Sequence, residues 1–253
     1  MLARARDIEA ATAVALVVSV VAFALPAALF WDVERGAWPY VAASAALELT
    51  YFTLLAAAYR RAEFSVVYPI ARGSAPVLVL AVAVVALGVS TSWEQAAGVG
   101  LVACGIVLVR GFNIGARVGG AAVGIVIGAV IAAYTLVDKA GLRHAEPVPY
   151  LEAAMVPPAI AYFAAAAMRN GLGSLRRELN ASTIVAGLAT FGAYALVLAA
   201  LKLAPAASVA AVRETSVIIA TAFAHAFLKE RVGWTRAAGA AAVVAGVGLL
   251  SLA

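Results

Sequence analysis

The sequence SVVYPIARGSAPVLVLAVAVVAL, from Ser65 to Leu87, decides how this chain folds. It is apolar over a length that crosses the hydrocarbon core of a bilayer as one helix, and its single charged residue is Arg72. An arginine inside a bilayer costs roughly 2.5–3.5 kcal/mol on insertion scales, so its presence marks a function by default. The stretch therefore predicts a membrane-spanning helix that carries a functional side chain.

Composition extends this prediction to the whole chain. Of its 253 residues, 65% are hydrophobic and 12% are charged, against roughly 25% charged in soluble domains. We therefore expect a polytopic α-helical protein surrounded by membrane lipid. The net charge of +5 comes from basic residues in short loops, which is typical of topology determinants and not of a nucleic-acid surface. Cys104, the only cysteine, lies within an apolar run and is interpreted as a packing residue.

Nine apolar runs are long enough, or nearly so, to cross the membrane. Short loops with turn and charge signals separate them, such as Trp31–Gly36 and Arg169–Glu178, and none has room for a soluble domain. We therefore expect one membrane domain. The predicted spans are Ala11–Phe30, Trp38–Ala58, Ala62–Leu87, Trp93–Val109, Val118–Val137, Pro147–Met168, Ser182–Leu201, Pro205–Leu228 and Thr235–Leu252.

The chain also contains an internal repeat. Ala210–Phe223 has the same pattern as the opening stretch, with Arg213 at the position of Arg72, an offset of 213 − 72 = 141 residues. Without a gap, the same offset aligns Trp93 with Trp234, Gly98 with Gly239, and Gly105 with Gly246. The span Val118–Val137 has no counterpart in the first half, which leaves four helices there and five in the second half. We infer that a first helix is missing at the amino end, either because the start is placed too late or because the helix has been lost.

Repeats with an odd number of helices insert in opposite orientations, which relates them by a pseudo-two-fold axis in the membrane plane. The expected fold is an all-α polytopic membrane protein, an inverted repeat of five-helix units with the first helix missing, and nine transmembrane helices in all. Inverted repeats are typical of secondary transporters, whose substrate site lies near the midplane where the repeats meet. Arg72 and Arg213 are then expected to face one cavity.

Three segments point to a family: AAYTLVDK (132–139), PIARGSAP (69–76) and FLKERVGWTRAAG (227–239). The first resembles the opening helix of an EamA-type repeat, and the other two resemble the junction of its fourth and fifth helices. The chain thus resembles the drug/metabolite transporter superfamily over essentially its whole length, with repeats expected at residues 1–110 and 117–253. The resemblance implies ten helices in two repeats and, most often, export of amino acids or similar metabolites. The chain departs from this pattern by lacking the first helix and any counterpart of Glu230 in the first repeat.

The basic residues and the resemblance imply opposite orientations. Of 18 Lys and Arg residues, 12 lie at alternate loops on one side and 4 on the other, with Arg72 and Arg213 inside spans. The positive-inside rule places the more basic side, with the amino terminus, in the cytoplasm and Ala253 outside. The usual family arrangement, with both ends of ten helices inside, implies the reverse, and the sequence leaves both orientations open.

Arg72 and Arg213 are the principal candidates for the site. Either they hold an anionic group of the substrate or pair with a carboxylate that exchanges protons, or they form a structural salt bridge or snorkel to an interface. Glu48, in the middle of its span, is expected to couple protons or pair with Arg72, or to form a purely structural ion pair. Glu214 follows Arg213 directly, so on a helix the two should point about 100° apart, with Glu214 contacting a neighbouring helix or serving in coupling.

Aromatic and polar residues complete the candidate set. Tyr68, one turn before Arg72, and Tyr134 and Tyr194 are candidates to line the cavity, with packing as the alternative. Asp138 is interpreted as a helix-ending residue, with proton coupling as the alternative. No group of His, Cys and acidic residues has metal-ligand spacing, and no phosphate-binding glycine loop or nucleophile–base pair is present. We therefore expect no metal, no cofactor and no enzymatic activity.

These observations predict a multi-pass secondary transporter in the inner (plasma) membrane of a prokaryote. It is expected to move a small polar or amphipathic metabolite, amino-acid-like or drug-like, by alternating access and in the direction of export. The expected partners are a small-molecule substrate, membrane lipid and the proton as coupling ion, with no nucleic acid. The alternative is a non-transporting membrane subunit or a truncated inactive paralogue, which the missing helix favours.

Overall fold

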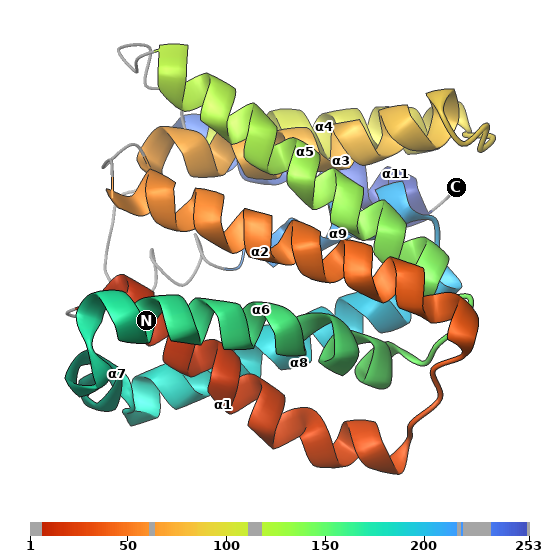
Figure 1. The fold of residues 1–253 in the computed structure, drawn as a ribbon. Coiled ribbons are helices and arrows are strands. Elements are labelled where there is room, and N and C mark those ends of the chain that lie inside the picture. The colour runs from red at the N-terminus through yellow and green to blue at the C-terminus, as the bar shows by residue number, and fades with distance from the viewer. Residues whose placement is uncertain (1–6, 61–63, 111–117, 217–218, 220–233, 252–253) are drawn as a thin grey trace. The chain divides into compact units, whose positions relative to one another are not determined.

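Helices make up almost all of the part of the chain that the computed structural model describes, residues 7–60, 64–110, 118–216, 219 and 234–251 (Figure 1). This confirms the predicted all-helical class. Within those ranges there is no strand, and one isolated bridge joins Val33 to Ala145. The α-helices are α1 (Ile8–Leu29), α2 (Trp38–Arg60), α3 (Phe64–Val85), α4 (Trp93–Arg110), α5 (Val118–Gly141), α6 (Pro147–Asn170), α7 (Leu172–Glu178), α8 (Ala181–Leu203), α9 (Ala206–Arg213) and α11 (Trp234–Ser251). A short 3₁₀ helix, η2 (Arg35–Ala37), precedes α2.

The apolar helices coincide closely with the predicted spans and make this a multi-pass membrane protein. The eighth predicted span, Pro205–Leu228, is described only in part, because residues 217–218 and 220–228 lie outside the described ranges. Helices long and apolar enough to cross a membrane are Glu9–Leu29, Arg35–Ala58, Ala122–Gly141, Pro147–Asn170 and Ala181–Leu203. Shorter apolar helices are Ile70–Val85, Trp93–Leu108 and Ala238–Leu250.

The segment Arg169–Glu178, predicted as a loop, contains a short helix instead. Helix α6 continues to Asn170, and α7 follows after the single residue Gly171. Gly171 has a φ of 74°, a conformation that glycine adopts without the steric cost of a Cβ. The prediction was wrong because Leu175 of α7 is only 4% exposed, and burial of such an apolar side chain stabilises a helix that the polar composition did not indicate.

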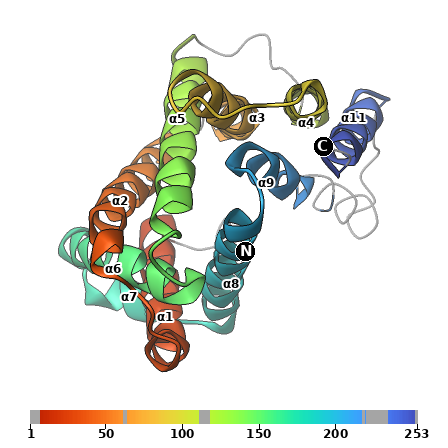
Figure 2. The same ribbon diagram turned by 90° about the vertical axis from the view of Figure 1, so that its right-hand side faces the viewer.

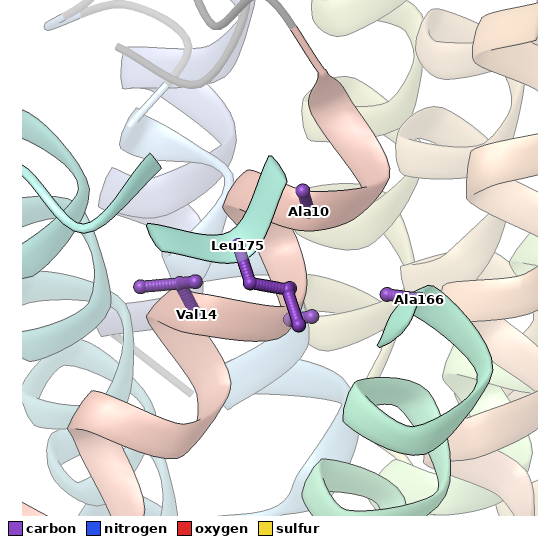
Figure 3. Close-up of a cluster of buried hydrophobic side chains, with 5 residues drawn as sticks. Ala10, Val14, Ala166 and Leu175 are labelled. Carbon is purple, nitrogen blue, oxygen red and sulfur yellow. The ribbon is translucent and has the colours of Figure 1, made fainter. Parts of the chain in front are cut away.

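One compact unit consists of Met1–Ala56 and Val137–Leu203, and in it α1 packs against α6 and α8. The start of α1 contributes Ala10, Ala13 and Val14 to a buried cluster with Ala166, near the end of α6, and Leu175 of α7 (Figure 3). Because the start of α1 meets the end of α6, these two helices run antiparallel. Small side chains allow the close approach by which helices associate in lipid.

The second compact unit consists of Ala57–Leu136 and Ala204–Ala253, and in it α4 lies along α11 (Figure 2). A Cβ added to Gly98 would lie 2.9 Å from the carbonyl oxygen of Gly246, and one added to Gly105 would lie 2.6 Å from that of Gly239. Residue numbers rise along α4 where they fall along α11, so the two helices are antiparallel. The 141-residue offset of the repeat relates Gly98 to Gly239 and Gly105 to Gly246, so it exchanges the two contacts with each other. The contact between α4 and α11 is therefore two-fold symmetric.

Helix α3 is the centre of the second unit, since it packs against both α4 and α9. Helix α5 also approaches it closely, because a Cβ on Gly124 would lie 2.8 Å from the Cβ of Ile70. This packing brings Arg72 of α3, Tyr134 of α5 and Arg213 of α9 into the same unit.

Candidate functional site

Arg72 forms an ion pair with Glu214, with Nη1 3.0 Å from Oε1 in hydrogen-bonding geometry. Arg72 projects from α3 and Glu214 directly follows α9, so the pair joins two helices that pack together. The side chain of Glu214 is 2% exposed and that of Arg72 is 20% exposed. Since both charges are largely removed from water, each would be costly without the other.

Arg213 belongs to the same group of side chains. Its Nε lies 3.9 Å from Oε1 of Glu214, and its Nη2 donates a hydrogen bond of 3.2 Å to the hydroxyl of Tyr134. Tyr134 is itself buried. The two arginines predicted to share a site therefore meet at one carboxylate. We call Arg72, Tyr134, Arg213 and Glu214 the arginine cluster.

Glu214 contacts a neighbouring helix, as one of the two sequence-based alternatives expected, through its ion pair with Arg72 of α3. Helix α9 ends at Arg213, and the N–H of Glu214 donates to the carbonyl of Ala211, three residues back and not four. That Glu214 and Arg213 point about 100° apart stays a prediction.

The arginine cluster contains two guanidinium groups but one carboxylate. Oε2 of Glu214 is buried without a hydrogen-bond partner among the described residues. The repeat explains the imbalance, because the 141-residue offset pairs Arg72 with Arg213 but pairs Gly73 with Glu214. The arginine is thus present twice and the carboxylate once.

Glu48 and Tyr68 were also predicted to contribute to the site. Glu48 is 3% exposed within α2, and it lies close enough to Tyr150 of α6 for an electrostatic interaction. Its pairing with Arg72 stays a prediction. Tyr68 lies on α3 one turn before Arg72, but its side chain falls outside the described residues.

Asp138, interpreted from the sequence as a helix-ending residue, is the centre of a second polar cluster, in the first unit. The hydroxyl of Tyr150 donates to Oδ1 at 3.0 Å, and the hydroxyl of Tyr194 donates to Oδ2 at 2.6 Å. Asp138 is 1% exposed. These three residues, which we call the aspartate cluster, join the end of α5 to α6 and α8.

Sequence reasoning missed Tyr150 and did not connect Tyr194 to Asp138. One signal was available, because a tyrosine buried in an apolar span needs a partner for its hydroxyl. The pattern could not say which acceptor each hydroxyl would reach, since Tyr194 lies 56 residues from Asp138. Only the packing of the helices makes that pairing.

Comparisons with known proteins agree with this architecture. A solved structure titled "Crystal structure of protein" matches with a TM-score of 0.78 and 15% identity, over 100% of this chain and 91% of that chain, which shows a shared fold. A comparison with curated proteins finds no match. In the described residues, no group of three or more His, Cys, Asp or Glu side chains is arranged to hold a metal ion. The profile of the EamA-like transporter family matches residues 1–111 and 118–252, which confirms the resemblance. The chain therefore belongs to the EamA-like transporter family, within the drug/metabolite transporter superfamily, and is a membrane transporter of that type.

Proposed function

We propose that this transporter is a secondary exporter of a small polar or amphipathic metabolite in the inner membrane of a prokaryote. The substrate carries an anionic group, which the arginine cluster holds. Transport proceeds by alternating access between two inverted repeats, residues 1–110 and 117–253. The driving force is the proton gradient or the gradient of the substrate itself.

The arginine cluster carries this proposal. Two arginines meet one carboxylate, that of Glu214, and the hydroxyl of Tyr134 accepts a hydrogen bond from Arg213. A guanidinium can hold a carboxylate through two parallel hydrogen bonds, so the carboxylate of a substrate has the chemistry to bind these arginines. An amino-acid-like or other carboxylate-bearing metabolite has this chemistry. A carboxylate on the substrate would compete with Glu214 for the arginines, so Glu214 provides a means of release.

Helix α9 ends at the same charged residues. The N–H of Glu214 bonds to the carbonyl of Ala211, three residues back, so the regular hydrogen-bond pattern of the helix changes at the charged pair Arg213–Glu214.

The contact between α4 and α11 supports the inverted arrangement. Two helices related by the repeat offset touch in an antiparallel and two-fold symmetric way at Gly98–Gly246 and Gly105–Gly239. An axis that relates repeats of opposite orientation produces this kind of contact. The contact between α4 and α11 does not bear on the number of membrane-spanning helices or on alternating access. Both are further parts of the proposal.

The test is transport by the purified full chain in liposomes. Vesicles are loaded with radiolabelled amino acids and small organic acids, singly, and efflux is compared for the native protein, Arg72→Ala and Arg213→Ala. Arg169→Ala is the matched control, since Arg169 is 66% exposed and lies at the end of α6. We expect efflux of at least one anionic substrate by the native protein and the control, and loss of that efflux in both other variants.

Three outcomes would contradict the proposal. Unchanged efflux in Arg72→Ala and Arg213→Ala, with normal membrane insertion, removes the arginine cluster as the substrate site. Efflux of neutral or cationic substrates alone removes the anionic substrate class. No flux of any substrate by the native protein supports the alternative, a non-transporting membrane subunit.

A further inference from the structure

Glu152 is a buried carboxylate that belongs to neither polar cluster. It lies on α6, within the candidate span Pro147–Asn170, and is 6% exposed. Its Oε2 is buried and has no hydrogen-bond partner among the described residues. If the carboxylate were ionised, its Oε2 would lack both water and a donor, which is a costly state inside a membrane.

The face of α6 on which Glu152 lies is set by helix geometry. Residues 14 apart on a helix are close to one face, so Glu152 shares the side of α6 that includes Ala159 and Ala166. Ala166 belongs to the buried cluster with the start of α1. Tyr150, two positions before Glu152, points roughly 200° away and serves the aspartate cluster. Glu152 therefore lies on the α1 side of α6.

Charged and titratable groups on the helices packed against α6 have other partners. On α1, Glu9 lies 3.8 Å from Arg169, and the N-capping Asp7 accepts a hydrogen bond from Ser174. Both contacts lie near the carboxyl end of α6, roughly 25 Å along the axis from Glu152.

Helix α2 also lies against α6, since the rings of Phe52 and Tyr162 are 6.2 Å apart, and its buried Glu48 interacts with Tyr150, on the opposite side of α6 from Glu152. Further groups of this kind are on α7 and α8. On α7, Glu178 accepts from the backbone N–H of Asp7, and Arg177 donates to the carbonyl of Gly173. Arg176 is in the same short helix, beyond the end of α6. On α8, Lys202 pairs with Glu146 at 2.7 Å, and Tyr194 donates to Asp138.

The protonated form of Glu152 suits this position better than the carboxylate does, because a neutral carboxyl loses less free energy than a charged one when an oxygen is buried without a donor.

We propose that Glu152 is the proton-binding residue of this transporter. In the conformation seen here its side chain is a neutral carboxyl. When the packing of α6 against α1 opens to water, the O–H bond breaks, the proton passes to water and the carboxylate remains; reprotonation from the other side restores the neutral form. This inference rests on the proposed transport function and supplies its coupling ion.

The first test compares Glu152→Gln with the native protein in liposomes. Glutamine keeps the shape of a protonated glutamate but cannot release a proton. We expect Glu152→Gln to lose transport driven by an imposed pH gradient, to the level of protein-free vesicles, while exchange of labelled for unlabelled substrate without a gradient continues. Glu152→Asp should recover part of the gradient-driven transport. Glu146→Gln, a change at the half-exposed N-cap of the same helix, is the matched control and should behave as the native protein does.

A second measurement tests the assignment of Glu152 separately from the proposed transport function, because it needs no substrate. Infrared difference spectra recorded across pH detect the carbonyl stretch of a buried protonated carboxyl. We expect this band in the native protein and in Glu146→Gln, and its loss in Glu152→Gln. Gradient-driven transport that survives in Glu152→Gln, or an unchanged band, would overturn the assignment of Glu152. Absence of any transport by the native protein would instead count against the proposed function.

Discussion

The two polar clusters of this transporter differ in how completely their hydrogen-bonding groups are used. In the aspartate cluster, each oxygen of Asp138 accepts a hydrogen bond from a tyrosine hydroxyl, at 3.0 and 2.6 Å. In the arginine cluster, Oε1 of Glu214 serves Arg72 at 3.0 Å and lies 3.9 Å from Arg213, whereas Oε2 has no partner among the described residues.

This difference separates a structural contact from a site that can respond to a ligand. A fully satisfied buried network gains nothing from a new partner and holds its helices in one arrangement. A cluster in which two arginines share one carboxylate, and in which that carboxylate keeps an oxygen without a donor, can exchange partners when a substrate carboxylate competes for the arginines. Each prediction below would break or sharpen this distinction.

The largest effect is expected for Glu214→Gln. Without the charge of Glu214 nothing displaces the substrate carboxylate from the arginines, so we expect slow release and a fall in turnover of roughly two orders of magnitude, or about 2.7 kcal/mol of activation free energy. Binding of an anionic substrate should become tighter, because its carboxylate no longer competes with Glu214. Transport rates in liposomes and calorimetric titration measure the two quantities, and Glu214→Asp is the control that keeps the charge. Normal turnover with unchanged affinity would mean that Glu214 is only structural.

Asp138→Asn, unlike Glu214→Gln, should lower the stability of the protein and leave the turnover of each folded molecule nearly unchanged. An amide keeps one acceptor but exchanges charge-assisted hydrogen bonds for weaker ones, so the free energy of unfolding should fall by about 1–3 kcal/mol. Unfolding of the purified protein in mixed detergent micelles measures this. A large fall in turnover at unchanged stability would show that the aspartate cluster belongs to the transport site.

Gly105→Ala tests the packing beside the arginine cluster. The new Cβ would lie 2.6 Å from the carbonyl oxygen of Gly239, and such overpacking costs typically 1–3 kcal/mol. Gly100→Ala on the same helix is the control, because a Cβ there meets nothing within 4 Å; it should stabilise by up to about 1 kcal/mol through helix propensity. Thermal unfolding in detergent compares the two. Equal effects would show that α4 and α11 do not pack closely in the membrane.

Tyr134→Phe is expected to have the smallest effect of the four. It removes only the hydroxyl that accepts from Arg213 at 3.2 Å, a hydrogen bond worth about 0.5–1.5 kcal/mol. Substrate affinity should change by roughly 2- to 12-fold, with stability nearly unchanged. Tyr194→Phe is the matched variant from the aspartate cluster, and it should lower stability but leave affinity alone. If Tyr134→Phe changes stability and Tyr194→Phe changes affinity, the roles of the two clusters are reversed.

The sequence by itself determined the helical spans, the 141-residue register and the two arginines within it. Backbone groups in lipid have no water to bind, so a long apolar run is restricted to helix, and hydropathy along the chain is enough to find it. The cost of a charge in the membrane likewise depends on local composition, which makes Arg72 and Arg213 visible without any knowledge of their surroundings.

Only the tertiary structure decided which groups these charges meet. Glu214 reaches Arg72 because α9 packs against α3, a contact between segments 142 residues apart that the sequence of neither one shows. Asp138, at the end of α5, meets Tyr194 of α8 across 56 residues of sequence. Glu152 looks like an ordinary residue near a helix start until its burial is known. Partners and burial depend on how helices pack, and that packing is a property of the whole chain that no single segment contains.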